Sequence, residues 1–310
     1  MRKTLCITAL VAALAAPAAH AGDAPDAPAP GGDRIARAVY DRMLLALREA
    51  ETLYYEGEYV TAYGDYTRRS SYRIWLKKPN CVRIEAPAEG DLKGVLVGDG
   101  LFFWIYWPGG LPESFWRYAG GEPEAYESHR MTSYMKKRAP PGGHSISHQA
   151  GDLAAGLGMF ITNPSAFHGA TDSMQGYLNE VRSLGEEKIG GEECFVIEAD
   201  YMKGQRQRRL WVSKEDFLPR LQREFIYVSR TITQEERWLN IRVDGEIADD
   251  KFRWRPPEGW RELRFPEAEA GLLDVGSEAP DFDVAAIGGG RITLRDLRGK
   301  IVWLNVWRAG

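Results

Sequence analysis

Cysteine, histidine and long apolar runs are scarce in this chain. Of its 310 residues, 3 are Cys and 5 are His, which leaves little material for a disulfide framework or a metal centre. No segment approaches the roughly 20 apolar residues of a membrane-spanning helix. Neither sign of charge dominates, with 40 basic and 44 acidic residues. This balance excludes the strong basic excess that is typical of a nucleic-acid-binding protein.

Signatures of catalysis are also missing. No isolated carboxylate pair lies in an apolar setting, no glycine-rich phosphate loop joins a strand to a helix, and no nucleophile elbow is present. His144, His148 and Asp152 have a spacing that suits a metal ion on a helix, but neighbouring glycines disfavour that helix, so a solvated or capping role is expected. The sequence predicts no catalytic residue, no metal ligand and no cofactor.

The N-terminus predicts export. A basic start and a mostly apolar stretch, Leu5–Leu14, precede the small-x-small sequence Ala19-His20-Ala21. This is the pattern of a cleaved secretory signal peptide, and its apolar part is too short to span a bilayer. We therefore expect a signal peptide at 1–21, a periplasmic location, and a flexible leader rich in Pro, Ala and Gly at 22–32.

Two cysteines, Cys81 and Cys194, remain beyond this segment. Each is expected on a strand, in NCVRIEA and in EECFVIEAD, and on the more polar side of that strand. In an oxidising compartment two cysteines can form a disulfide. The pattern permits a Cys81–Cys194 bridge without establishing it, because the two Cα atoms have to approach within about 7 Å.

Residues 33–266 have the pattern of one helix followed by an antiparallel sheet. Asp33 is a plausible N-cap for a helix at about 34–50, in which Ile35, Val39, Met43 and Leu47 recur every four residues. About ten segments of strand length follow, separated by short turns that contain Gly, Pro or Asn and are typical of hairpins.

Two regions depart from this regular alternation. Between about 109 and 185 the pattern breaks, and short helices or a lid-like insertion are expected there. The region closes with DKFRWRPPEGWRELRF, expected as a last strand that is ended by Pro256-Pro257. A sheet of this size has to curl to cover its apolar face. The prediction is therefore an α+β fold with a curved antiparallel sheet, an unclosed barrel, an N-terminal helix and a helical insertion.

This arrangement resembles the LolA-like superfamily of periplasmic lipoprotein carriers and envelope-stress sensors. The resemblance is carried by the initial helix, by YRIWLKKPNCVRIEA with GVLVGDGLFFWIYWP, and by DDKFRWRPPEGW, which is similar to the closing F-x-x-x-P-P-E-G strand of those proteins. It covers most of 33–266. It implies an unclosed barrel whose concave, apolar face holds acyl chains beneath a helical lid.

Candidates for such a groove are the aromatic residues of 101–107, a stretch that is apolar on both faces. They are Phe102, Phe103, Trp104, Tyr106 and Trp107. For each of them, a place in the ordinary hydrophobic core is the alternative interpretation. The basic runs 136–138 and 206–209 are expected as solvated loops or as a rim that contacts anionic lipid headgroups or an acidic partner.

The segment from Leu273 is similar to the start of a redoxin (peroxiredoxin and TlpA-like) thioredoxin-fold domain. The similarity rests on Val275-Gly276, on Ala279-Pro280-Asp281-Phe282 and on Asp296-Leu297-Arg298-Gly299-Lys300, which leads into an apolar run at 301–307. It implies that this run is the first central strand of a thioredoxin sheet, after which the redox Cys pair would follow. The sequence ends at Gly310 without one, so an incomplete thioredoxin-like domain at 273–310 is expected, without thiol chemistry of its own.

The sequence therefore predicts an exported protein that binds an apolar ligand or an acylated lipoprotein. Two alternatives remain open. One is a thiol–disulfide oxidoreductase whose catalytic half lies beyond Gly310, which would make the protein an enzyme. The other is a non-enzymatic sensor that reports envelope lipids to a protein partner. A peripheral membrane contact is compatible with these functions, and no nucleic-acid partner is expected.

Overall fold

A computed structural model of the chain describes residues 33–87, 92–118, 121–139, 146, 164–169, 177–227, 231–264, 273, 276–286 and 289–302. Contacts divide the chain into two units. The larger is Ala27–Pro266, and the smaller combines Met1–Asp26 with Glu267–Gly310. None of the described helices has the length and apolar character needed to cross a membrane.

Helix α1 (Arg34–Glu49) confirms the predicted N-terminal helix and its cap. The Asp33 carboxylate accepts hydrogen bonds from the backbone N–H groups of Ile35, at 2.8 Å, and Ala36, which satisfies donors that the first helical turn leaves unpaired. The buried face consists of Ala36, Val39, Tyr40, Met43 and Leu47. Ile35, which the spacing of four had placed on this face, is 69% exposed, and Ala36 takes its place.

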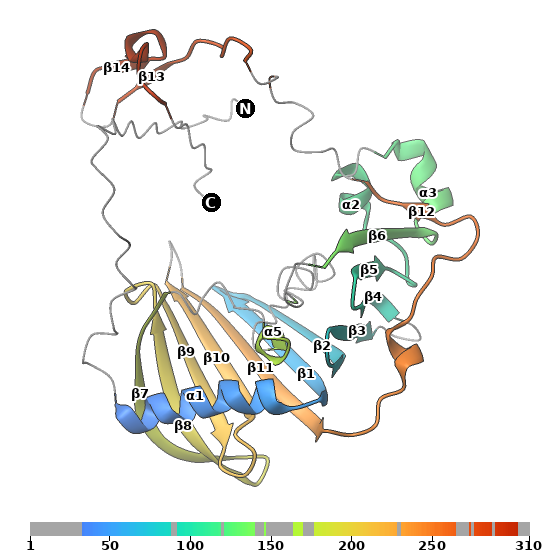
Figure 1. Ribbon diagram of the computed structural model, residues 1–310, viewed down its shortest axis with the longest axis vertical. Helices are drawn as coiled ribbons and strands as arrows, with labels where there is room; N and C mark the ends of the chain where they lie inside the picture. Colours follow the sequence, from blue (N-terminus) through green and yellow to red (C-terminus); the bar gives the residue numbers. More distant parts are fainter. Residues whose placement is uncertain are drawn as a thin grey trace. The chain divides into compact units, whose positions relative to one another are not determined.

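Twelve strands in the described part of the chain form one curved sheet (Figure 1). They are β1 (Thr52–Tyr63), β2 (Tyr66–Lys77), β3 (Cys81–Pro87), β4 (Leu92–Asp99), β5 (Phe102–Tyr106), β6 (Ser133–Arg138), β7 (Leu178–Ile189), β8 (Glu192–Tyr201), β9 (Arg206–Ser213), β10 (Pro219–Tyr227), β11 (Thr231–Val243) and β12 (Arg261–Glu262). Their order is β12-β6-β5-β4-β3-β2-β1-β11-β10-β9-β8-β7. The ends β12 and β7 do not pair, so the sheet is unclosed, as predicted.

Two meanders make up this sheet, and one contact joins them. Strands β1 to β6 follow each other in space, and so do β7 to β11. Strand β11 then pairs antiparallel with β1, from Leu53↔Val243 to Tyr63↔Ile232. All neighbours are antiparallel except the short pair β12 and β6.

The core lies between the inner face of the sheet and two helices, α1 and α5 (Pro164–Phe167). One cluster of buried side chains combines Leu47 of α1 and Phe167 of α5 with Tyr55, Phe103 and Trp238 of the sheet. A second cluster packs α1 against β7, β8 and β9. Because strands from both meanders contribute inward-pointing residues to the same layer, the sheet curls around these helices.

The region predicted as a break at 109–185 contains more sheet than expected. Three short helical segments, α2 (Glu113–Tyr118), η1 (Pro123–Ala125) and α3 (Tyr126–His129), confirm the helical part. Strand β6 and most of β7 also lie in this region, so the sheet continues through part of the stretch in which its regular pattern breaks. Both strands are polar, and β7 is an edge strand with mainly exposed side chains, so neither shows the apolar alternation that identifies a half-buried strand.

The prediction of a last strand that is ended by Pro256-Pro257 was wrong. A 3₁₀ turn, η3 (Asp249–Phe252), is followed by chain without strand structure up to β12. Prolines 256 and 257 cannot donate to a strand ladder. The aromatic residues of this closing segment (249–264) instead pack onto the outer face of the sheet: Trp254 stacks on Tyr106 of β5, with ring centroids 4.4 Å apart.

The smaller unit contains a short hairpin, β13 (Asp283–Ala285) and β14 (Arg291–Thr293), and a 3₁₀ turn, η5 (Arg295–Leu297). In the strand predicted at 301–307, Ile301 and Val302 have no strand structure, and the remaining residues lie outside the described part of the chain. The resemblance to a redoxin domain therefore stays a prediction.

A glycine in β1 makes room for the aromatic rings of the core. Gly57 lies opposite Tyr72 in β2 and opposite Trp238 in β11. A Cβ atom built on Gly57 would overlap the phenol ring of Tyr72, and Tyr72 is only 1% exposed, so this ring has little space to move.

We predict that Gly57→Ala lowers the free energy of unfolding by about 1–3 kcal/mol, the usual cost of overpacking a core. Gly245→Ala is the matched control, because a Cβ there meets open space. Urea denaturation of both variants checks the prediction, and equal stability of the two would contradict it.

Candidate functional site

A buried carboxylate lies at the centre of the inner face. Glu236 of β11 is 1% exposed and lies between Tyr59 of β1 and Gln222 of β10 in the strand register. Gln222 in turn lies opposite Leu210 of β9, which packs in the cluster under α1. Since successive residues of a strand alternate between faces, Glu236 points to the same inner side as these neighbours.

Three donors surround this carboxylate. Glu236 accepts hydrogen bonds from the hydroxyl of Tyr72, from the side-chain amide of Gln222, and from the Trp238 indole N–H at 3.1 Å. The indole ring is itself stacked on Tyr55 at a centroid distance of 3.8 Å. Burial raises the pKa of Glu236 to about 8, although the Trp238 N–H lowers it. The cluster is thus a polar group that is fully enclosed in an otherwise apolar layer.

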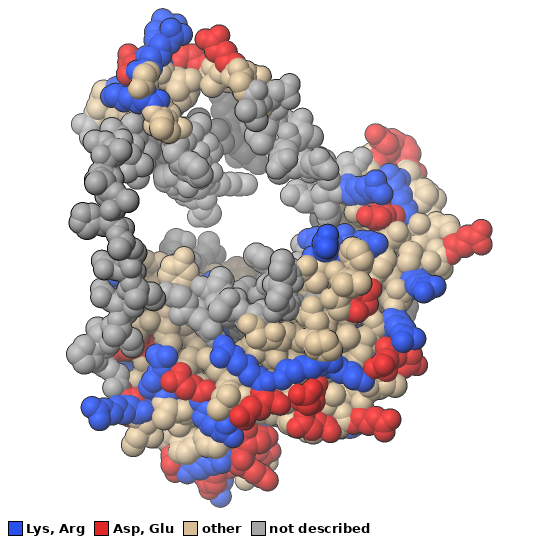
Figure 2. Space-filling model, in the orientation of Figure 1, with Lys and Arg blue, Asp and Glu red and all other residues tan. Residues whose placement is uncertain are grey.

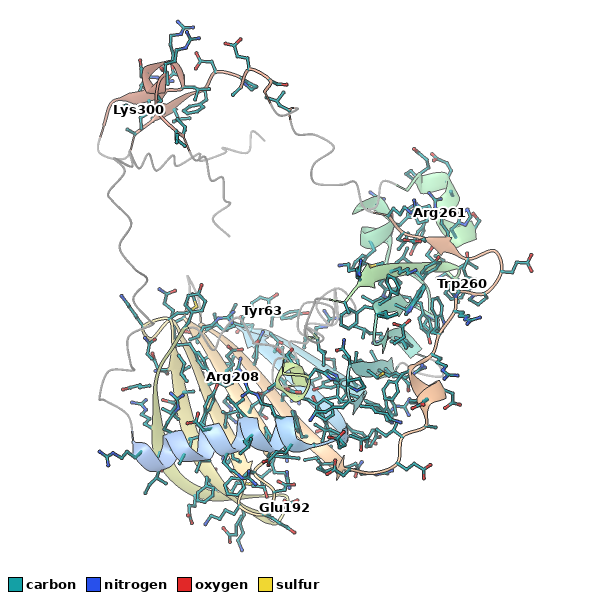
Figure 3. All side chains as sticks on the ribbon, viewed as in Figure 1. Tyr63, Glu192, Arg208, Trp260, Arg261 and Lys300 are labelled. Atoms are coloured by element: carbon teal, nitrogen blue, oxygen red, sulfur yellow. The ribbon has the colours of Figure 1, made fainter. Side chains whose placement is uncertain are left out.

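A second polar group lies beside it on β9 and β10. Arg208 is 4% exposed and lies 3.6 Å from a carboxylate oxygen of Glu224, which Arg206 also approaches at 3.5 Å. Figure 3 labels Arg208 on the face that α1 crosses. The guanidinium of Arg208 also lies over the Tyr201 ring, 5.6 Å from its centroid. The basic run 206–209, predicted as a solvated loop or rim, is thus part of a strand, and Arg208 is buried.

Sequence reasoning missed Glu236 because its strand carries charged residues on both faces. In TITQEERWLN, Glu235 points outward to an ion pair with Arg223, and Glu236 points inward. Only the register of β11 against β1 and β10 determines which of the two adjacent glutamates faces inward. The nearby Trp238 was the available signal, since it shares the face of Glu236 two residues away.

A cavity of about 580 Å³ opens where α1 ends and β1 begins. Its walls include Arg48 of α1, the turn residues Lys78 and Pro79 between β2 and β3, and Phe167 and His168 at the end of α5. The ammonium group of Lys78 donates to the backbone carbonyl of Arg48 and lies 5.1 Å from the centroid of the Phe167 ring. The cavity thus combines an aromatic wall with two basic side chains.

The aromatic residues predicted to line one groove lie on two different faces. Phe103 and Trp107 belong to the inner cluster. Trp104 and Tyr106 point outward with Val95 and Val97, and pack against Trp254 and Trp260 of the closing segment. Phe102 is also on the outer side, where the Lys136 ammonium lies 4.0 Å from the centroid of its ring.

Phe102, Trp104 and Tyr106 therefore do not share a face of the sheet with Trp107. The stretch is apolar on both faces because the closing segment covers the outer one. Contact with a ligand stays a prediction for each residue, and Trp107 is the one of the four that faces the inner layer.

The closing segment is held to the outer face by charge as well as by aromatic packing. Glu85 is 6% exposed. Its carboxylate forms ion pairs with Arg83 at 2.7 Å, Arg73 at 2.9 Å and Lys251 at 3.3 Å. Burial alone raises the pKa of this carboxyl, but Arg83 and Lys251 outweigh burial and hold the pKa below its usual value. Lys251 also lies 3.7 Å from the ring centroid of Trp75.

The predicted Cys81–Cys194 bridge is not formed. Both residues are free thiols. They lie on β3 and β8, and five strands separate these two strands in the sheet, each at a spacing of about 4.8 Å. Cys81 shares its face with Arg83, as expected, whereas Cys194, although it shares a face with Glu198, is buried in an apolar cluster with Val196, Trp211 and Leu221.

Among the described residues, no group of three or more His, Cys, Asp or Glu side chains is placed to hold a metal ion. The spaced residues His144, His148 and Asp152 lie outside the described part of the chain.

The chain is similar to several solved structures, but it cannot be assigned to a protein family. No protein-family model matches the chain, and no curated protein matches its sequence. A LolA superfamily protein from Nitrosomonas europaea is 11% identical, with 71% of this chain and 97% of that chain covered and a TM-score of 0.32. The Mycobacterium tuberculosis lipoprotein LppX is also 11% identical, with 71% and 100% covered and a TM-score of 0.37.

A third similar structure is the Pseudomonas aeruginosa MucA/MucB complex, at 11% identity, with 84% of this chain and 74% of that chain covered and a TM-score of 0.35. At these values the chain is not assigned to a family.

The pKa of Glu236 predicts how stability depends on pH. The folded protein keeps a proton on this carboxyl up to about pH 8, whereas the unfolded chain releases it near the ordinary pKa of 4.5. The contribution of this group is therefore fully present below pH 4.5 and is lost as the pH rises to 8. We expect the free energy of unfolding to fall between pH 5 and 8.

Glu236→Gln, which cannot ionise, is expected to flatten this decline, and the exposed Glu246→Gln is expected to leave it unchanged. Denaturant titrations at pH 5, 6, 7 and 8 measure the slopes. Equal slopes for all three proteins would assign the decline to other groups.

Two free thiols also predict the outcome of alkylation. Burial raises the pKa of Cys81 and of Cys194, so neither thiol is expected to react readily in the folded protein. In denaturant without a reductant, iodoacetamide is expected to modify both cysteines. Peptide mapping by mass spectrometry checks this, and a linked pair of peptides around Cys81 and Cys194 would refute it.

Proposed function

We propose that the unit Ala27–Pro266 binds an amphipathic lipid, with an apolar chain and an anionic head, as a carrier or sensor in the bacterial envelope. The observation that supports it is the 580 Å³ cavity at the end of α1, which has Phe167 on its wall and Arg48 and Lys78 beside it. Small-molecule sites typically have this size and combine an apolar lining with a few polar groups.

The charged side chains at the cavity, and not the net charge of the whole protein, support a ligand with an anionic head. Lys and Arg side chains are interspersed with Asp and Glu on the face shown in Figure 2, and the whole chain has a formal charge of −4. At the cavity, Arg48 makes no ion pair with another described residue, and Glu51 is the acidic residue on the wall. A carboxylate or phosphate head would therefore meet a basic side chain that has no described charge partner.

The location of the protein follows from the sequence alone. The signal-peptide pattern of 1–21 supports export to the periplasm. In that compartment, an acylated lipoprotein or a membrane lipid would supply the chain and the head that the cavity suits.

The redox alternative rests on the residue pattern of 276–300 and remains a second proposal. Cys81 and Cys194 do not support it, because burial raises the pKa of both thiols and thiol chemistry needs a thiolate. Protein isolated from its native envelope would have to reduce insulin disulfides for this alternative to hold.

We predict that Arg48→Ala weakens binding of dansyl-undecanoic acid about fivefold, which corresponds to the loss of about 1 kcal/mol of an exposed charge interaction. The methyl ester of the same probe, which lacks the anionic head, should bind both proteins equally. Arg34→Ala is the matched control, an exposed arginine at the other end of the same helix.

Fluorescence titration measures these affinities. Equal loss for the acid and its ester would mean that Arg48 does not recognise the head. Absence of saturable binding for both probes would exclude the proposed lipid site.

A further inference from the structure

Strand β2 has an open edge along its first half. On one side the whole strand pairs with β1, from Tyr63↔Tyr66 to Thr52↔Lys77. On the other side, β3 pairs only with 73–77 (Figure 1). Residues 66–72 therefore pair with no strand on that side within the described parts of the chain.

This edge exposes backbone hydrogen-bonding groups. In an antiparallel pair, every second residue directs its N–H and C=O away from the partner strand. An extended peptide placed beside 66–72 would satisfy these groups by adding a strand to the sheet. The outer ends of the sheet are less suitable, because β7 carries two register shifts and exposed charged side chains, and β12 has only two residues.

A cavity of about 390 Å³ lies along this edge. Arg69 and Ser70 of β2 line one side of it, and Ala86 at the end of β3 and Lys93 of β4 line the other. The buried hydroxyl of Ser70 has no hydrogen-bond partner among the described residues. A buried polar group without a partner costs free energy, so this hydroxyl indicates an occupant that would complete the site.

The two faces of the edge differ in chemistry. Register places Arg69 on the outer face and Ser70 on the inner face beside Tyr59. Lys93 of β4 lies at the irregularity where Ala86 pairs with Gly94 and Pro87 with Leu92, and it lines the same cavity as Arg69. Arg69 and Lys93 make no ion pair within the described residues. The acidic residue of the cavity, Glu58, lies opposite Arg237 in the register of β1 and β11.

We propose that this edge docks an extended segment of a partner protein in which acidic and apolar residues alternate. The segment adds a strand beside β2, with its acidic side chains next to Arg69 and Lys93 and its apolar side chains next to Tyr59. A second copy of this chain is disfavoured, because pairing two β2 edges would bring one Arg69 close to the other. The site is distinct from the lipid cavity at the end of α1 and does not depend on it.

The test uses a fluorescein-labelled peptide of four Val-Glu repeats and the full protein. We expect saturable binding by fluorescence anisotropy, and binding at least tenfold weaker for a peptide of four Val-Lys repeats. The double variant Arg69→Glu/Lys93→Glu should reverse this preference. Arg34→Glu/Arg255→Glu changes the net charge equally at exposed positions away from the cavity and should retain it.

Strand addition is separated from charge attraction by N-methylation. One Val-Glu peptide is methylated at every valine nitrogen and another at every glutamate nitrogen, so that each loses the N–H groups of one edge. Only the peptide whose methyl groups face β2 should lose binding. Equal binding of both peptides, or an unchanged preference in Arg69→Glu/Lys93→Glu, would overturn the proposal.

Amide hydrogen exchange at 66–72 tests the edge directly. In the free protein, alternate amides of this segment should exchange rapidly, and the Val-Glu peptide should slow them at least tenfold. Full protection of all these amides in the free protein would mean that the chain's own residues fill the edge. Protection that grows with protein concentration would mean that a second copy does. Either result would overturn the proposal.

Discussion

The pairing of β1 with β11 is the contact on which the larger unit depends. It joins two meanders that would otherwise each be an open sheet with an unpaired edge, and it does so between segments as far apart in sequence as Leu53 and Val243. Pairing between segments far apart in sequence is favoured only if side-chain contacts offset the loss of chain entropy. These contacts lie in the middle of the interface, where Gly57 leaves room for the Tyr72 ring to lie over the strand and Trp238 stacks on Tyr55.

The buried carboxylate of Glu236 fits this role. A slip of one residue between β1 and β11 would turn Glu236 outward and place the adjacent Glu235 in the core, away from the donors Tyr72, Gln222 and Trp238 that satisfy Glu236. An unsatisfied buried carboxylate is far more costly than a hydrogen-bonded one. The polar cluster thus adds little net stability, but it makes a slip of one residue worse than the native register, which is a physical reason for an ionisable residue at this position.

The sequence predicted the elements whose local pattern determines their environment, and missed those whose environment comes from distant segments. Asp33 caps a helix through its own neighbours, and the alternating strands that follow it fold as hairpins, so both were predictable. The faces of Trp104 and Tyr106 were not, because the cover on their outer side, Trp254, lies about 150 residues further along the chain. Polar strand β7 was missed for the related reason that an edge strand buries little of its surface.

The outer face of the sheet is closed in two ways, and this leaves few places for a ligand. Across β3 to β6 it is covered by the closing segment through Lys251 and Trp254. Across β7 to β9 it is occupied by ion pairs, in which the buried Glu198 is held by Arg182 and by Arg209, the latter at 2.8 Å. The cavity of about 580 Å³ adjoins the open end of the β1–β2 hairpin, and the cavity of about 390 Å³ adjoins its middle, where Tyr59 lies beside Glu236 in the register. Because the Glu236 cluster fixes the register of these strands, an occupant of either cavity contacts strands that are already ordered.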